Sequence, residues 1–342
     1  LLREADWGHR HAHCETGYRL LQPFAHLSLL ATAIRYHHTP WVELPSGLVE
    51  SEALDSNLIL LGDRVDAMVF QRGLENPLFN RVGIVEAVAA LAGHELSPVV
   101  VDAFLGVAAR EAFWIALVPR HVQRYVLDLP LGDWRLSINF PQFGHVARLI
   151  SSIVDAKSHF TAAHSLGVAQ LARYLGERAG LAGDTPARLE VAGLMHDVGK
   201  LCVPDEIVDK PAGLTPLEFS VMERHSFETY EILRHIPGLE QVAEWAAFHH
   251  EALNGNGYPF RRGADGLSTE ARIVAVADVF QALAQERPYR GAQRAEEIPR
   301  LLNDFVGNGV LDGELVALAC EDLDGSWRAA TVVPSPEACG LD

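Results

Sequence analysis

The chain of 342 residues is 49% hydrophobic and has a mean hydropathy of +0.07, which is enough for folded cores and argues against disorder. Its formal net charge of −17 argues against polymeric DNA or RNA as a partner, because those partners need basic patches to release counterions. This charge does not exclude a small phosphodiester, since bound divalent cations can supply local positive charge.

The sequence contains few signals for targeting or compartment. The longest apolar stretch, 104–118, is interrupted by Arg110 and Glu111, so the sequence predicts no transmembrane helix. The four cysteines are scattered without CxxC spacing, and we interpret them as reduced, buried or incidental thiols of a cytoplasmic protein. The chain begins at Leu1 without a methionine, so we expect it to be a piece of a longer protein.

Taken in chain order, the elements are predicted to be helical almost throughout. A first helical domain is expected over 1–117 and a linker over 118–150, which could contain one short strand at 134–138. A second helical domain is expected over 151–325, followed by a tail over 326–342. Thr215-Pro216 followed by Glu218 predicts a helix start, with Thr215 as the cap. Apolar periodicity predicts further helices over 161–178, 239–248, 269–283 and 296–306, and one that ends over 190–194.

The two domains share an internal repeat. His225 is followed twenty-four residues later by the pair His249-His250. His13 is followed at the same spacing by His37-His38. The first domain is therefore predicted to be a degenerate copy of part of the second.

The repeat continues to a later landmark, where 277–283 parallels 62–68 and Asp278 falls opposite Asp63. Matching positions of the two copies differ by 212 in residue number at His13 and His225, and by 215 at Asp63 and Asp278. The first copy therefore has a loop between these landmarks that is shorter by three residues. By this offset Leu1 matches residues near Thr215, and the first copy begins halfway through its own fold. We expect that its missing half lies upstream or that a partner chain completes it, in a homodimer or a signalling complex, because a half-domain with exposed apolar helices is poorly soluble.

Potential metal ligands follow one another along the second domain. Imidazoles and carboxylates gathered in one place suit Fe, Mn, Ni or Zn, but seven ligands are too many for one ion that keeps a position for water. A carboxylate can bridge two ions, and two ions are the usual apparatus for in-line attack on phosphorus. The sequence therefore predicts a two-metal phosphohydrolase with the ligands His164, His196, Asp197, His225, His249, His250 and Asp278.

Taken singly, these residues have simpler interpretations. An isolated pair such as His196-Asp197 is more often a core histidine beside a capping aspartate. One member of His249-His250 could serve packing alone, since neighbours on a helix point about 100° apart and both reach one cluster only at a helix end. Lys200 and the run Arg287-Pro288-Tyr289-Arg290 could be solvated or could bind phosphate. Tyr258 could sit in an exposed turn or stack on a base.

Taken together, the motifs resemble a known family, the HD-GYP subgroup of the HD phosphohydrolases. They are His-Asp-x-Gly-Lys at 196–200, His-His-Glu at 249–251, Gly-Tyr-Pro at 257–259, Ala-Asp-Val-Phe at 277–280 and Arg-Pro-Tyr-Arg at 287–290. The resemblance is dense over 150–325, and 1–117 is similar to a degenerate HD-type copy. It implies an all-α HD-type helical bundle preceded by an incomplete N-terminal helical repeat of the same type.

The resemblance also implies an activity and a role for each residue. The activity is hydrolysis of cyclic di-GMP to pGpG and then GMP at two divalent metal ions, commonly iron or manganese, with nickel, zinc or magnesium as alternatives. One ion would be held by His164, His196, Asp197 and Asp278, and Asp197 would bridge to a second ion held by His225, His249 and His250. Phosphate would contact Lys200, Arg287 and Arg290, and a base would lie near Tyr258.

Departures from the family pattern shape the remaining expectations. Phe160 stands where some members carry a glutamate for a third metal, so two ions are expected. Asn254, Gln281 and the loop at 210–212 differ from the usual residues and leave the substrate open. The first copy lacks Gly-Tyr-Pro, so no catalysis is expected there.

The expected mechanism centres on Asp197 and Lys200. A water that bridges the two ions would lose a proton near neutral pH and attack phosphorus, while Lys200 and the ions stabilise the developing charge. Two alternatives remain open at this point. One is a phosphohydrolase of another cyclic dinucleotide or nucleotide, and the other is a non-catalytic nucleotide-binding signalling protein.

Overall fold

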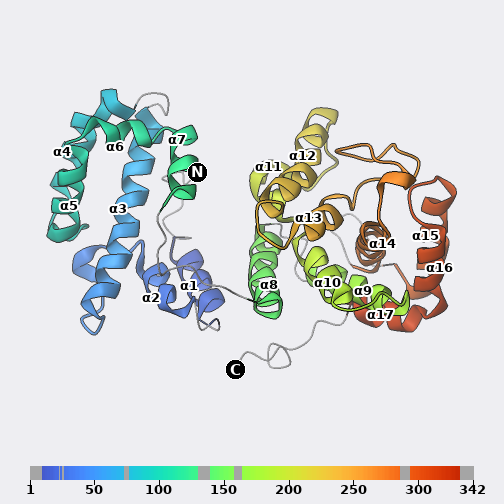
Figure 1. The fold of residues 1–342 in the computed structure, drawn as a ribbon. Helices are drawn as coiled ribbons and strands as arrows, with labels where there is room; N and C mark the ends of the chain where they lie inside the picture. Colours follow the sequence, from blue (N-terminus) through green and yellow to red (C-terminus); the bar gives the residue numbers. More distant parts are fainter. Residues whose placement is uncertain are drawn as a thin grey trace. The chain divides into compact units, whose positions relative to one another are not determined.

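The computed structural model describes residues 10–331 apart from 23, 25–26, 73–76, 130–138, 158–163 and 286–292. The chain divides into two compact units, with the boundary between residues 137 and 138. Both units are helical, and the described residues contain no strand beyond one isolated bridge between Ala92 and Leu96 (Figure 1). The predicted all-α fold is therefore confirmed, while the short strand considered at 134–138 lies outside the described residues.

The first unit is organised around its longest helix, α3. Its helices are α1 (Arg10–Leu21), α2 (Ser28–Tyr36), α3 (Glu50–Arg72), α4 (Arg81–Ala90), α5 (Pro98–Ala108), α6 (Glu111–Ala116) and α7 (Pro119–Leu127). Short 3-10 turns lie at η1 (Trp41–Glu43) and η2 (Pro77–Asn80). Leu60 and Val69 of α3 pack with Ile84 of α4 and Phe104 of α5 in one apolar core. Trp114 of α6 completes this core and donates its Nε1–H to Ala108 O at 2.8 Å.

The second unit is wrapped around α14, most of whose side chains are buried. Its helices are α8 (Phe140–Lys157), α9 (His164–Arg178), α10 (Thr185–Met195), α11 (Asp205–Val208), α12 (Pro216–Leu233), α13 (Glu240–Ala247), α14 (Thr269–Ala284), α15 (Ile298–Gly307), α16 (Gly313–Glu321) and α17 (Leu323–Thr331). The turns are η4 (Val198–Cys202), η5 (Ala264–Gly266) and η6 (Ala295–Glu297). Helices α9, α10, α13, α15, α16 and α17 all contact α14 (Figure 1). A single apolar core therefore surrounds the helix that carries Asp278.

The predicted helix start at Thr215 is confirmed in detail. Its hydroxyl accepts a bond from Glu218 N at 3.3 Å, and the Glu218 carboxylate accepts one from Thr215 N at 2.7 Å. These two bonds form a capping box, which satisfies two backbone donors at the start of α12. The stretch expected as a linker, 118–150, contains α7 and the first part of α8. Within the described residues, no helix is both long and apolar enough to cross a bilayer.

Candidate metal centre

A tight turn after α10 places His196 and Asp197 in the interior of the second unit. His196 is the last residue of that helix region, and Asp197 leads into η4, which packs against α12. A Cβ on Gly199 would lie 1.9 Å from His225 O, so only glycine permits this close approach. Thr229 of α12 accepts a bond from Gly199 N and donates one to His196 O, each at 3.0 Å. The turn is therefore fastened to the helix that carries His225.

The other predicted ligands come from the ends and faces of neighbouring helices. His249 and His250 follow the end of α13, which is where both can face one cluster, as the sequence predicted. His164 begins α9, and Asp278 lies within α14. The structure brings all seven together in three overlapping groups with ligand atoms within 4.8 Å of one another: His164, His196 and Asp278; His196, Asp197 and His249; and His225, His249 and His250.

Asp197 lies between two sets of imidazoles. Its Oδ2 is 3.2 Å from His196 Nε2 and 3.9 Å from His164 Nε2. Its Oδ1 is 3.5 Å from His225 Nε2 and 4.0 Å from His249 Nε2. Each carboxylate oxygen thus belongs to a different half of the cluster, as a bridging ligand requires.

The protons of three of these imidazoles point away from the cluster. His196, His225 and His249 each donate Nδ1–H to the carbonyl three residues earlier, at 2.7, 2.7 and 2.6 Å respectively. Such bonds fix the ring orientation and, in a neutral ring, leave Nε2 unprotonated, as is usual for histidines that bind metals. The lone pairs of His225 Nε2 and His249 Nε2 consequently face each other at 3.4 Å.

A buried oxygen shows that these residues fit metal ions. Asp197 Oδ1 is enclosed and has no hydrogen-bond donor among the described residues. A buried anionic oxygen without a donor costs free energy, and so do lone pairs that converge on it. Divalent cations placed among these atoms would satisfy all of them, and the mixed imidazole and carboxylate set suits iron, manganese, nickel or zinc.

Electrostatics keep His225, His250, Asp197 and Asp278 in the forms that metals bind. Burial lowers the pKa of His225 to about 4 and that of His250 to about 3, so both are neutral at neutral pH. Burial opposes ionisation of Asp197 and Asp278, but the neighbouring His196 holds the pKa of the Asp197 carboxyl below its usual range, and a hydrogen bond with His164 does the same for Asp278. Burial also opposes protonation of His196, yet Asp197 and Asp278 outweigh it and raise its pKa to about 9.

Two predicted substrate contacts lie beside the cluster. Lys200 makes a close ion pair with Asp197 Oδ2, a partner that the sequence did not indicate. The Tyr258 ring packs against His250, with ring centroids 4.8 Å apart, and its backbone N–H donates to His250 O at 3.1 Å. Arg287 and Arg290, predicted to bind phosphate, lie outside the described residues, as does Phe160.

Two further residues that position the cluster were not predicted to do so. Gln281 is buried one turn after Asp278, and its Oε1 accepts Nδ1–H of His164 at 2.5 Å. Glu251 accepts bonds from the backbone of Phe260 and Arg262 at 2.7 and 2.8 Å, which holds the loop around Tyr258. The spacing of Gln281 from Asp278, one helical turn, is the only sequence signal for the first role.

Comparisons with known proteins identify relatives of this chain. A family model described as an HD domain matches residues 148–315. The 3′3′-cGAMP-specific phosphodiesterase 1 of Vibrio cholerae is 34% identical over 313 residues, which are 89% of this chain and 72% of that protein. A cyclic di-GMP phosphodiesterase of Pseudomonas aeruginosa is 33% identical over 168 residues, which are 48% of this chain and 40% of that protein. The crystal structure of a cyclic GMP-AMP-specific phosphodiesterase of V. cholerae shares the fold, with a TM-score of 0.63, 23% identity, and coverage of 97% of this chain and 75% of that one.

Proposed function

The chain belongs to the HD-GYP family of HD-domain phosphohydrolases, and from this premise we propose that it is a metal-dependent phosphodiesterase of cyclic dinucleotides. The observation that carries the proposal is the carboxylate of Asp197, whose two oxygens face two separate sets of imidazoles. A protein that only binds nucleotides has no use for such a shared ligand. Two cations held a few Å apart are the usual apparatus for hydrolysis of phosphodiesters.

We assign the ligands to two ions. The first ion would be held by His164, His196, Asp197 and Asp278, and the second by Asp197, His225, His249 and His250. When bound, the cations would stabilise charge on the phosphate oxygens and lower the pKa of water from ~15.7 to about 7. Iron and manganese are our preferred ions, because the set combines imidazoles with hard carboxylates.

The remaining polar groups would place the substrate. The Lys200 ammonium pairs with Asp197 and puts a positive charge at the edge of the cluster, where a phosphate can meet it. Burial raises the pKa of the Tyr258 hydroxyl, so the phenol stays neutral and its ring can pack beside a base. We keep Arg287 and Arg290 as phosphate contacts, on the basis of their motif alone.

Among cyclic dinucleotides, we propose that 3′3′-cGAMP is preferred over the cyclic di-GMP that the motifs alone imply. The support is the relative named for 3′3′-cGAMP, which is similar across 89% of the chain and so across both units. The relative named for cyclic di-GMP aligns with 48% of the chain. Water would add across one P–O3′ bond, the 3′ oxygen would leave with a proton, and the first product would be a linear dinucleotide with a 5′ phosphate.

A turnover assay on the full chain tests both levels of the proposal. The protein is stripped with a chelator, reloaded with Mn²⁺ or, without oxygen, Fe²⁺, and given equal amounts of the two cyclic dinucleotides. Chromatography with mass detection should show linear product only after reloading, with 3′3′-cGAMP consumed at least about tenfold faster, a difference of about 1.4 kcal/mol in activation free energy. Equal or faster loss of cyclic di-GMP would overturn the substrate preference alone. Absence of product from both, in protein shown to contain metal, would overturn the enzyme assignment.

A further inference from the structure

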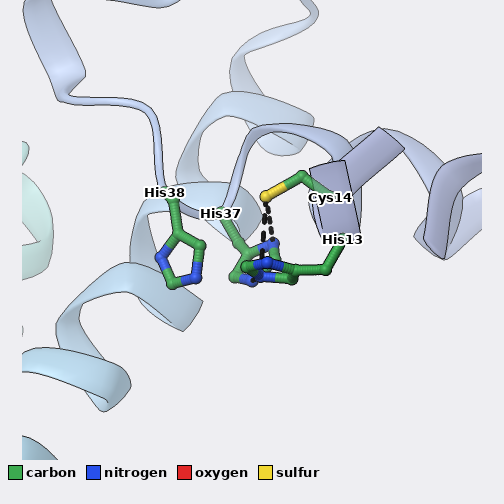
Figure 2. A group of neighbouring side chains, drawn as sticks. All are labelled: His13, Cys14, His37 and His38. Carbon is green, nitrogen blue, oxygen red and sulfur yellow. Dashed lines mark hydrogen bonds between the residues drawn. The ribbon is translucent and has the colours of Figure 1, made fainter. Parts of the chain in front are cut away.

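The first unit has its own cluster of metal-binding side chains, which the proposed function does not use. His13 and Cys14 lie on α1, and His37 and His38 follow the end of α2 (Figure 2). One ligand atom from each of the four lies within 4.8 Å of the others. The Cys14 side chain is 2% exposed, so its sulfur is a buried part of the cluster. One thiolate with imidazoles is a ligand set typical of zinc.

Two separations between these ligand atoms match those expected around a single tetrahedral ion. With Zn–N bonds of about 2.0–2.1 Å and a Zn–S bond of about 2.3 Å, two nitrogens lie about 3.3 Å apart and nitrogen and sulfur about 3.6 Å apart. His13 Nε2 lies 3.3 Å from His37 Nε2 and 3.7 Å from Cys14 Sγ. Cys14 Sγ also lies 3.6 Å from His37 Nδ1, so the thiol lies beside this ring, although Nδ1 itself is turned to a backbone carbonyl. Figure 2 shows these three side chains drawn together, with His38 beside them.

A backbone carbonyl and a carboxylate orient two of the imidazoles. His37 donates Nδ1–H to Ile34 O at 2.5 Å, which leaves Nε2 for a ligand role. His38 Nδ1 lies 3.4 Å from Asp63 Oδ2, so a carboxylate from α3 holds this ring. A carboxylate or carbonyl behind a histidine is the usual support of a metal ligand.

The helices that carry this cluster match those of the second unit. Helix α1 ends at Leu21 and α12 ends at Leu233, while α2 begins at Ser28 and α13 at Glu240, all at the offset of 212 residues. Asp63 on α3 falls opposite Asp278 on α14, at the offset of 215. The carbonyl bonded by His37 is three residues earlier, as it is for His249.

The three histidine rings also match. Ring centroids of His13 and His37 are 5.2 Å apart, against 5.4 Å for His225 and His249. Those of the adjacent pair are 4.0 Å apart in both units. The remaining separation, from His13 or His225 to the second histidine of its pair, is 4.9 Å in the first unit and 5.2 Å in the second. The first unit thus reproduces the half of the metal centre assigned to the second ion.

One substitution gives this half-site a different chemistry. Cys14 occupies the place of Ser226, whose hydroxyl lies 3.1 Å from His225 Nε2. A thiolate is a far better ligand than a hydroxyl for a soft or borderline cation. At the offset of 212, none of the described residues of the first unit corresponds to Asp197.

From this geometry we propose that the first unit binds one zinc ion through His13, Cys14, His37 and His38. The ion would clasp α1 to the end of α2, and through the contact of His38 with Asp63 it would tie both to α3. Structural zinc sites take four protein ligands and contribute directly to folding, so this ion would stabilise the unit without serving as a reaction centre. The proposal does not depend on the activity of the second unit.

Cobalt absorption on the full chain tests the site, because Co²⁺ replaces Zn²⁺ in tetrahedral sites and reports a thiolate ligand by charge-transfer absorption. The predicted ligands of the second unit include no cysteine, so this band reports the first unit alone. Chelator-treated protein titrated with Co²⁺ should gain the band and strong visible bands of tetrahedral cobalt. Added Zn²⁺ should abolish both.

Matched variants locate the ligand. Cys14→Ser should lose the charge-transfer band, and its helical circular dichroism should persist because Ser226 fills the matching place in the second unit. Cys202→Ser, at an exposed cysteine, should retain the band. His13→Ala removes an exposed side chain, so it leaves no cavity in the core. It should weaken cobalt binding at least about tenfold, because even the loss of a group that only hydrogen-bonds to a metal ligand has an effect of that size. A band that survives Cys14→Ser, or wild-type protein that takes up no thiolate-bound cobalt, would overturn the proposal.

Discussion

The two histidine clusters differ in the group that accompanies the imidazoles. In the second unit Asp197 lies between His196 and His225 and offers one oxygen to each side. In the first unit the buried thiol of Cys14 lies beside His13 and His37. A shared carboxylate creates a place for two ions, whereas a thiol completes the ligand set of one.

The repeated scaffold fixes where imidazoles meet and leaves the chemistry to a few positions. The placement of three histidines, one within a helix and an adjacent pair after the end of the next helix, is alike in both units. The turn that contributes His196 and Asp197 is what would separate a reaction centre from a structural site.

The largest effect on turnover should follow from Asp197→Asn. This substitution keeps the shape of the side chain but makes it a weaker ligand for two ions at once. Turnover of 3′3′-cGAMP should fall about 10²- to 10⁴-fold, because the contribution of a metal is several kcal/mol and about 1.4 kcal/mol is tenfold in rate. Turnover is measured together with the metal content of each preparation. Asp184→Asn, at an exposed carboxylate paired with Arg188, is the matched control. Full turnover by the metal-loaded Asp197→Asn variant would show that no bridge is needed.

A large effect on stability is expected where the turn that contains Gly199 packs against α12. In Gly199→Ala the new Cβ collides with backbone of α12, so the free energy of unfolding should fall by about 1–3 kcal/mol. Binding of both ions should weaken as Asp197 is displaced. Gly213→Ala is the control, because a Cβ there meets nothing within 4 Å. Denaturant unfolding and metal titration of the two variants measure the contrast, and equal stabilities would contradict the close packing.

Much of the second unit could be predicted from the sequence because its signals are local. The cap at Thr215, the end of α13 before His249, and α14 over Thr269–Ala284 all follow from residues close together in the chain. The ligand set was predicted through its order along the chain, and the structure gathers these residues.

What the sequence did not indicate depends on contacts between distant segments. The bond from His164 to Gln281 spans 117 residues, and spacing alone does not reveal it. Cys14 was interpreted as a reduced, buried or incidental thiol and not as a ligand, because its proximity to His37 arises only when α1 packs on α2. Lys200 was expected at a phosphate, whereas an ion pair with Asp197 is available before any substrate arrives.

A moderate effect on metal affinity is expected from Gln281→Met, which removes the oxygen that accepts a hydrogen bond from His164 Nδ1–H. Loss of such a partner typically costs about 10- to 100-fold in metal affinity, so the first ion of the second unit should bind that much more weakly. Gln281→Glu keeps an oxygen acceptor and should restore affinity. Asp66, the matching residue of the first unit, is exposed, so Asp66→Asn should not change cobalt binding there. Metal competition titrations measure these affinities, and unchanged binding by the methionine variant would refute the orienting role.

The smallest effect is expected on thermal stability, from the hydrogen bonds of Glu218 at the start of α12. A hydrogen bond from Lys210, with bonds from Thr215, lowers the pKa of Glu218 from 4.5 to about 2. Because the folded-state pKa is lowered, the stabilisation is fully present above pH 4.5 and is lost as the pH falls through about 2. Glu218→Gln should therefore melt slightly lower than wild type at pH 7, and the gap should close toward pH 2. A difference in melting temperature between wild type and Glu218→Gln that widens in acid would contradict this role of Glu218. Glu206→Gln, on exposed α11, is the control for the loss of one negative charge.

Anomalous X-ray diffraction from crystals of the metal-loaded full chain tests the comparison most directly. Data collected on either side of the manganese and zinc absorption edges locate and identify each ion. We predict two manganese peaks in the second unit, one beside each oxygen of Asp197, and one zinc peak among His13, Cys14, His37 and His38. A single ion in the second unit, or ions that do not share Asp197, would contradict the proposed bridged centre.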